Sequence, residues 1–141
     1  MQQPQEAEIQ LFHAQICQAL ADPTRILLLY RLAEGPHNVG ELAAELKISQ
    51  PTVSRHLKVL RERGMVTTTR HGATVEYRLI DDRPIQALDL LRSVLRDSLS
   101  RNAELAGVLN ESDEARETPR NAGETAKQQE SDSRLTRESN P

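Results

Sequence analysis

The stretch K-I-S-Q-P-T-V-S-R-H-L-K-V-L-R-E-R-G, residues 47–64, decides the fold. Ser49 is a favourable N-cap, and Pro51 is tolerated in the first helical turn, where a backbone N–H has no intrahelical acceptor. Gly64 is a typical residue just past a helix end. Three apolar residues recur at i, i+4 and i+7, which places them on one stripe: Val53, Leu57 and Leu60. The spacing therefore predicts a helix with one side facing a core.

The other side of this helix carries short polar donors and cations, which are the side chains that a helix in a DNA major groove uses. We expect four of them to reach base edges: Gln50, Thr52, Ser54 and Arg55. Arg55 is the one best suited to address a guanine, because its fork matches the two acceptors of that base. His56 is expected either to contact DNA or to pack at the edge of the core.

A second short helix is predicted just upstream, from Asn38 to Leu46. Asn38 is its N-cap, and Glu41 three residues later completes a capping box. A tight turn at residues 47–49 then leads into the basic helix. Two short helices joined in this way, the second one basic, predict a helix-turn-helix motif.

After Gly64 the apolar period changes from 3.6 residues to 2, which indicates strands. Residues 65–70 and 75–80 are expected to form a hairpin around a turn at 71–73. A hairpin directly after a recognition helix is a wing, which can lie along the phosphate backbone. We expect the phosphate contacts to come from Lys58, Arg70, His71 and Arg78.

The charge distribution supports a polyanionic partner, although the formal net charge of the whole chain is −3. Residues 47–78 carry a net charge of +5, from seven basic residues against Glu62 and Glu76: Lys47, Arg55, Lys58, Arg61, Arg63, Arg70 and Arg78. The local field decides binding to a polyanion, and here that field is positive.

Three more helices complete the expected fold. One spans residues 6–20, and a second runs from Pro23 to Ala33 behind an Asp22 N-cap. A third starts near Pro84 and carries an apolar stripe over roughly 25 residues, longer than a small core can cover. The members of that stripe are Ile85, Leu88, Leu91, Leu95, Leu99, Leu105 and Leu109. We therefore expect the first and last helices to form a dimer interface.

The sequence predicts a mainly α fold with a small β-hairpin, a homodimeric winged helix-turn-helix. Residues 1–109 form the DNA-binding and dimerisation domain in this interpretation. Residues 110–141 hold eight acidic and five basic residues and almost no apolar ones, so we expect a disordered polar tail. Aromatic residues are only 2% of the chain, so the core must be aliphatic.

Several function classes find no support in the sequence. It contains no glycine-rich phosphate loop and no nucleophile beside a plausible base, so we do not expect an enzyme. No run approaches the length of a membrane span, and the N-terminus lacks the pattern of a secretion signal. Cys17 is the single cysteine, which excludes an internal disulfide and favours a cytoplasmic setting.

His13 and Cys17 lie four residues apart on the first expected helix, so they share a face. That spacing suits two ligands of a transition metal ion such as nickel or zinc, with further ligands from a partner chain or from His37. The alternative is a packing cysteine beside a surface or interface histidine, because two ligands are only half a site.

Three segments resemble the ArsR/SmtB winged-helix repressors of prokaryotes. Residues 19–25 (A-L-A-D-P-T-R) resemble the family's opening signature, and residues 49–57 with Leu60 resemble its recognition helix. Residues 64–66, 70–72 and 75–77 resemble its wing. The resemblance covers roughly residues 9–100 and implies a homodimer that represses transcription from a palindromic operator until an inducer, often a metal ion, releases it.

The family's usual metal sites are not matched. Many members carry a cysteine pair before the recognition helix, where this chain has Asn38 and Gly40. Others use histidines on the last helix, whereas the last histidine here is His71. Three alternatives therefore stay open: a protein–protein module, a repressor whose sensing is supplied by a partner protein, and a direct metal sensor using His13 and Cys17.

Overall fold

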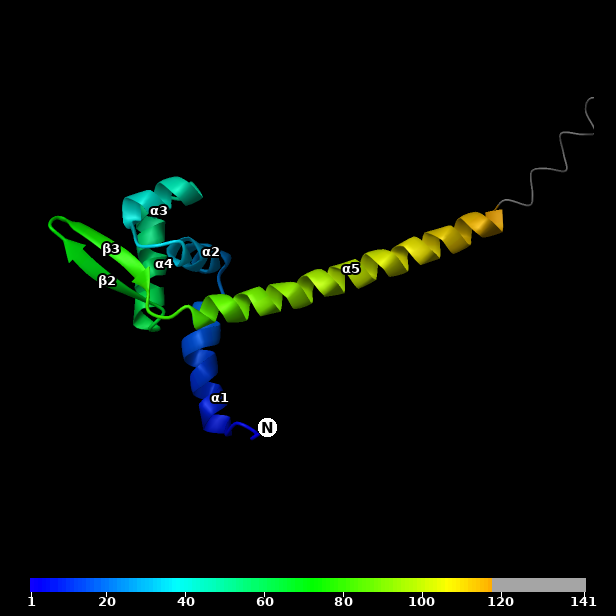
Figure 1. The fold of residues 1–141 in the computed structure, drawn as a ribbon, viewed down its shortest axis with the longest axis horizontal. Helices are drawn as coiled ribbons and strands as arrows, with labels where there is room; N and C mark the ends of the chain where they lie inside the picture. The colour runs from blue at the N-terminus through cyan, green and yellow to red at the C-terminus, as the bar shows by residue number, and fades with distance from the viewer. Residues whose placement is uncertain (118–141) are drawn as a thin grey trace, which may run out of the picture. The chain divides into compact units, whose positions relative to one another are not determined.

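The computed structural model describes the backbone of residues 1–117 and the side chains of residues 1–111. The elements in chain order are α1 (Glu6–Phe12), a π-helical segment η1 (His13–Cys17), α2 (Pro23–Ala33), β1 (His37–Asn38), α3 (Val39–Leu46), α4 (Gln50–Glu62), β2 (Val66–His71), β3 (Thr74–Leu79) and α5 (Arg83–Glu117) (Figure 1). The mainly α fold with a β-hairpin after the basic helix is confirmed.

An aliphatic core joins α2, α3, α4 and the start of β2. Seven of its side chains are almost wholly removed from solvent: Leu28, Leu29, Leu42, Val53, Leu57, Leu60 and Val66. Burying an aliphatic side chain of this size contributes roughly 1.5–3 kcal/mol, so this cluster is the main source of stability. The predicted stripe of α4 is buried as expected, because its three members all belong to this core.

The caps of the three core helices match the sequence predictions. Asp22 Oδ1 accepts from the backbone N–H of Thr24 at 2.8 Å and of Arg25 at 3.2 Å, at the start of α2. Asn38 and Glu41 form the reciprocal capping box of α3. Gly64 follows α4 with a positive φ of 73°, which suits a residue without a Cβ.

The sheet has three strands in the order β1-β3-β2, all antiparallel. The sequence predicts the hairpin of β2 and β3 but gives no sign of β1. Two residues are too few to show a period of 2, and here they also begin the capping segment of α3. In the sheet, His37 pairs with Tyr77 and Asn38 with Glu76.

The first predicted helix, residues 6–20, is interrupted. Residues 13–17 form a π-helical turn, in which the backbone N–H of Gln18 donates to the carbonyl of His13. One residue more per turn leaves little trace in an apolar pattern, so the sequence did not reveal it. Ile16 and Leu20 pack against the core, whereas Ile9 and Phe12 are exposed.

The last helix is longer than predicted, since α5 continues through residue 117. The boundary placed at Asn110 is therefore wrong for residues 110–117. Their low apolar content indicated disorder, but extending an existing helix adds one hydrogen bond per residue and needs no apolar side chain. The rest of the predicted tail, residues 118–141, lies outside the described residues.

The chain divides into two compact units after Leu91, and not at the predicted boundary after Leu109. The first unit contains the core and ends just after Leu88, which is 7% exposed. In the second unit, the described part of α5 carries large apolar side chains that are all more than half exposed. Among the described residues, no helix combines the length and apolarity that crossing a membrane requires.

Candidate nucleic-acid interface

The turn between α3 and α4 sets the start of the basic helix. Lys47 ends α3 in the left-handed conformation, with φ 55° and ψ 44°. The backbone N–H of Ile48 donates to the carbonyl of Ala43 at 3.1 Å, which closes the end of α3. Lys47 is the one residue other than glycine with a positive φ among the residues described, and such a residue bears some backbone strain. The helix-turn-helix therefore contains a sharply defined corner.

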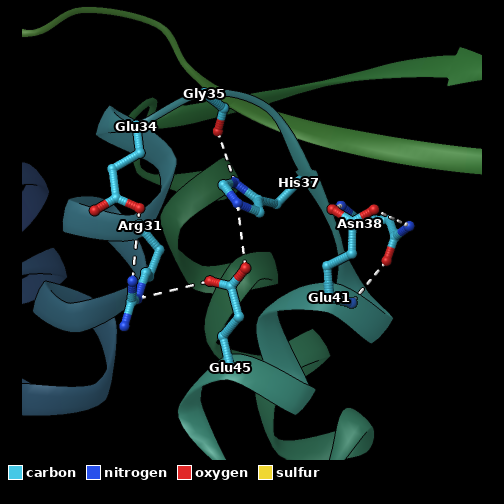
Figure 2. Close-up of polar contacts among 7 residues, drawn as sticks. All are labelled: Arg31, Glu34, Gly35, His37, Asn38, Glu41 and Glu45. Atoms are coloured by element: carbon cyan, nitrogen blue, oxygen red, sulfur yellow. Dashed lines mark hydrogen bonds and ion pairs between the residues drawn. The ribbon is translucent and has the colours of Figure 1, made fainter.

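A polar cluster holds α3 against α2 and β1 (Figure 2). Glu45 of α3 lies between two cations or potential cations, with 3.7 Å from Oε2 to Arg31 Nε and 3.6 Å from Oε1 to His37 Nε2. The other ring nitrogen of His37 is 2.7 Å from the carbonyl oxygen of Gly35. Arg31 also pairs with Glu34 at 3.5 Å. These contacts tie the first helix of the motif to the elements that flank it.

The N-terminus of α4 is capped by Ser49. Its Oγ accepts from the backbone N–H of Thr52 at 3.4 Å and donates to Thr52 Oγ1 at 2.8 Å. Thr52 is half-buried, so its predicted contact with a base competes with this capping pair. Thr52 thus belongs to the helix start as well as to the polar face.

The outward face of α4 presents the other predicted base-reading residues. The side chains of Gln50, Ser54 and Arg55 are exposed, and among the described residues the side chains of Ser54 and Arg55 make no hydrogen bond or ion pair. Arg55 lies nearly opposite the buried stripe on the helix circumference. Lys58, one turn further on, is 76% exposed and lies 3.9 Å from Glu62. The structure therefore brings a guanidinium, an ammonium and two short polar groups to one accessible surface.

His56 lies elsewhere. Its side chain is 13% exposed, and Nδ1 is 3.9 Å from Asp22 Oδ1 at the cap of α2. Burial would raise the pKa of Asp22, but the backbone N–H groups of Arg25 and Thr24 and the charges of His56 and Arg25 outweigh it and lower that pKa. This position favours the packing alternative for His56 and does not support its assignment to DNA.

The predicted phosphate contacts of the wing divide between the two faces of the hairpin. Arg78 lies opposite Thr67, and His71 lies opposite Thr74, so both share one face. Arg70 lies opposite Val75 on the other face. All three side chains are exposed, and His71 Nε2 is 3.3 Å from Glu76 Oε2. A phosphate backbone along one face of the wing would thus meet His71 and Arg78 together.

Two arginines for which the sequence predicts no specific contact hold the N-terminal segment in place. Arg63, at the end of α4, donates from Nη1 to the carbonyl of Ala14 at 2.9 Å. Arg25, in α2, donates to the carbonyls of Ala19 at 2.8 Å and Gln18 at 2.9 Å. Arg63 enters the sequence prediction only through the local charge of residues 47–78, and Arg25 only through the segment 19–25 that resembles the family's opening signature. No sequence signal distinguishes an arginine that donates to a backbone carbonyl from one that contacts a phosphate.

The proposed metal ligands are only partly brought together. His13 and Cys17 both belong to the π-helical segment, but no group of three or more His, Cys, Asp or Glu suited to a metal ion occurs in the described part of the chain. His37 does not fit as a third ligand, because its ring nitrogens already face the carbonyl of Gly35, just before β1, and the carboxylate of Glu45 in α3. Among the described residues of one chain, His13 and Cys17 therefore remain half a site.

Comparison with known proteins agrees with this geometry. Residues 22–68 match the family described as bacterial regulatory protein, arsR family. A biofilm growth-associated repressor of Agrobacterium fabrum is 42% identical over 79 residues, which cover 56% of this chain and 68% of the relative.

Solved structures show the same fold. NolR from Sinorhizobium fredii superimposes with a TM-score of 0.58 at 31% identity, over 67% of this chain and 96% of that protein. A homodimeric winged helix-turn-helix DNA-binding domain from Mycobacterium bovis superimposes with a TM-score of 0.58 at 26% identity, over 69% of this chain and 90% of that one. With its core helices, its wing and its relatives in agreement, the chain belongs to the ArsR family of bacterial regulatory proteins.

Proposed function

We propose that this protein is a homodimeric transcriptional repressor that binds a palindromic DNA operator through α4 and the wing, and that an effector releases it. The observation that carries the proposal is the exposed face of α4. Ser54, Arg55 and Lys58 lie opposite a fully buried stripe, in a chain whose relatives are transcriptional repressors. This surface has the donors that major-groove recognition requires.

The base contacts and the phosphate contacts have separate roles in this proposal. Arg55 addresses a guanine, while Gln50, Ser54 and the capping Thr52 reach neighbouring base edges. Lys58, Arg78 and His71, with Arg70 at the hairpin tip, hold phosphates and thereby fix the orientation of the helix. Affinity then depends strongly on salt, because each neutralised phosphate releases counterions.

A twofold pair follows from the apolar surface of the first unit. In α1, Ile9 is 47%, Leu11 63% and Phe12 51% exposed, and at the start of α5 Leu90 is 69% and Leu91 64% exposed. Monomeric proteins rarely expose so many large apolar side chains, and the similar domain from Mycobacterium bovis is described as homodimeric. Two copies of α4 in one dimer would enter successive major grooves about 34–36 Å apart.

Two alternatives remain for how the effector is sensed. His13 and Cys17 of both copies together would supply four ligands of the kinds that zinc or nickel accepts. A partner protein that carries the sensor is the alternative, because Asn38 and Gly40 occupy the places of the family's thiolate ligands. Both readings place the protein in the cytoplasm, where its operator and a reducing environment are found.

The experiment that tests the main proposal is selection of bound DNA from a random pool by the full chain, followed by a mobility-shift titration on the selected sequence. We expect a palindromic consensus and a binding constant whose logarithm falls with the logarithm of salt by roughly 0.9 for each phosphate contacted. A pool that shows no enrichment would contradict DNA recognition, and an asymmetric consensus would contradict the dimer.

The metal alternative has its own test. Nickel, zinc and cadmium are titrated calorimetrically into the parent protein and into the Cys17→Ser variant. Binding by the parent that the variant loses would support a site at His13 and Cys17. Identical titrations would exclude Cys17 as a ligand and favour sensing by a partner.

A further inference from the structure

His37 lies where the sheet meets the helix-turn-helix, and both of its ring nitrogens face oxygen acceptors (Figure 2). Nδ1 is 2.7 Å from the carbonyl oxygen of Gly35, and Nε2 is 3.6 Å from Oε1 of Glu45. The side chain is only 16% exposed, so water has little access to either contact. A carbonyl oxygen and a carboxylate oxygen accept hydrogen bonds but cannot donate them. Each nitrogen of His37 therefore faces a group that attracts an N–H.

The neutral imidazole satisfies only one of these two acceptors, because it carries a single N–H. The short contact with the carbonyl of Gly35 assigns that proton to Nδ1. Nε2 then presents a lone pair to the carboxylate of Glu45, and the two repel each other. Protonation of the ring gives Nε2 an N–H and a share of positive charge. The contact between His37 and Glu45 thus changes from repulsive to attractive when the ring gains a proton.

The charged and titratable groups on the elements around this histidine come from α2, α3 and β3: Arg31, Glu34, Glu41, Glu45, Glu76 and Tyr77. Arg31 approaches Glu45 through the other carboxylate oxygen, with 3.7 Å from Nε to Oε2, so it leaves Oε1 to the histidine. Glu34 pairs with Arg31, Glu41 completes the capping box of α3, and Glu76 pairs with a histidine of the wing. Glu45 is therefore the carboxylate that responds to the charge of His37.

The contact between His37 and Glu45 joins the wing to the turn that precedes the recognition helix. His37 belongs to β1 and pairs with Tyr77 of β3. Glu45 lies in the last turn of α3, two residues before Lys47 ends that helix. A firm contact here holds the start of α4 in a fixed orientation relative to the wing. Affinity increases when the parts that meet a ligand need no reordering on binding.

We propose that protonation of His37 strengthens DNA binding by tying β1 to the end of α3, so that this regulator responds to pH. The inference rests on the proposed function and assigns a regulation to the same interface. In the protonated state the wing and α4 meet a duplex in a fixed arrangement. In the neutral state the repulsion from Glu45 loosens it. Imidazole is the side chain that changes its charge between about pH 5 and pH 8, so the response falls in a physiological range.

The first test compares the full-length parent with the His37→Asn variant on the DNA sequence selected from the random pool. The asparagine amide can still donate to the carbonyl of Gly35, but it does not titrate. We expect the variant to bind like the parent near about pH 8 and about tenfold more weakly near about pH 6, because each copy in the dimer loses one ion pair. The other histidines are present in both proteins, so their effects cancel in the ratio of the two dissociation constants. A ratio that is independent of pH would overturn the proposal.

Two further variants identify the partner of the ring. Glu45→Gln removes the charge that the protonated ring contacts, so it should lose the same pH-dependent part of the affinity. Arg31→Gln is the matched control, because it removes the other partner of Glu45 and should retain the pH dependence of the parent. Thermal unfolding verifies that each variant is folded. A Glu45→Gln variant with the pH dependence of the parent would overturn the role of this carboxylate.

A second measurement needs no DNA. Long-range proton–nitrogen correlation spectra of the nitrogen-15-labelled full chain report which ring nitrogens of His37 carry a proton. We expect a proton on Nδ1 alone near about pH 8 and on both nitrogens near about pH 6. A neutral ring that carries its proton on Nε2 would contradict the arrangement on which the response to pH depends.

The outcomes distinguish this inference from the proposed function. If the parent and His37→Asn bind the selected DNA with the same dependence on pH, the regulation is removed and the repressor proposal stays. If the parent enriches no DNA at any pH, the repressor proposal fails and the regulation fails with it. The ring spectra would then still show whether His37 and Glu45 form a contact that depends on pH.

Discussion

The helices α4 and α5 are both amphipathic, yet their apolar faces have opposite fates. In α4, Val53, Leu57 and Leu60 are each 0% exposed, because α2, α3 and β2 pack around them. In α5, Leu95 and Leu99 are each 58% exposed. An apolar stripe in a sequence thus predicts that a helix face will be buried. It does not tell whether the same chain or another chain buries it. The length of the stripe distinguishes the two cases, because the core of a small domain covers only a few helical turns.

The largest expected effect tests this contrast directly. Leu57→Ala should lower the free energy of unfolding by about 2–5 kcal/mol at every protein concentration, because it leaves a cavity within one chain. Leu99→Ala should act mainly by making the urea midpoint more dependent on protein concentration, because in the proposed dimer its contacts lie between chains.

Urea titrations of both variants at two protein concentrations tenfold or more apart would check the pair. If Leu99→Ala destabilised as much as Leu57→Ala, with no dependence on concentration, the face of α5 would be covered within its own chain. The comparison between the helices would then fail.

The second largest expected effect is on DNA binding by the outward face of α4. Arg55→Ala should weaken binding to the selected DNA by about 1–3 kcal/mol and relax the preference at one base position. Arg61→Ala is the matched control, because it removes the same charge from the last turn of the same helix. Equal losses on specific and on random DNA for both variants would show that Arg55 contacts phosphate and reads no base.

The start of α4 gives a smaller effect. Ser49→Ala removes the side-chain acceptor of the Thr52 N–H and should cost about 1 kcal/mol of stability. Ser49 lies outside α5 and the proposed dimer interface. The dimerisation constant measured by sedimentation should therefore stay unchanged. Thermal unfolding of the variant checks the first expectation. A stability equal to that of the parent would mean that solvent satisfies the helix end equally well.

The smallest effect is a dependence on pH at the contact between α4 and α2. The pKa of Asp22 is lowered in the folded protein, so its carboxylate contributes stability above the unfolded pKa of about 3.9 and loses that contribution as the pH falls through the folded value. The difference in stability between the parent and Asp22→Asn should therefore be constant above about pH 5 and shrink below about pH 4. Chemical denaturation across this range measures it, and a constant gap would show that Asp22 titrates normally.

Much of the fold was predictable because its signals are local. The caps at Asp22, Asn38 and Ser49 and the glycine after α4 each depend on residues within one turn, and α2 runs over the predicted Pro23–Ala33. The π-helical turn and β1 were not predicted, because both depend on contacts with residues far along the chain. His37 joins the sheet through Tyr77, forty residues away, and Ala14 is held by Arg63.

The candidate site shows the same limit. A helical period separates the outward Ser54 and Arg55 from the buried stripe, so their exposure was predictable from sequence. His56 lies between the two faces, and only the position of Asp22, the N-cap of α2, decides that its side chain turns inward. Which of the wing cations share a face likewise depends on the strand register, which pairs Thr67 with Arg78.

The short strand β1 has a mechanical consequence. Asn38 pairs with Glu76 of the wing and also caps α3, so a single residue belongs to both the sheet and the first helix of the motif. A force on the hairpin is transmitted to the start of α3 through the two pairs that join β3 to β1. No flexible loop separates β1 from α3. In the proposed complex with DNA, the wing and the helix-turn-helix would therefore move together, and an effector that breaks the pairing of β1 with β3 would weaken both sets of contacts.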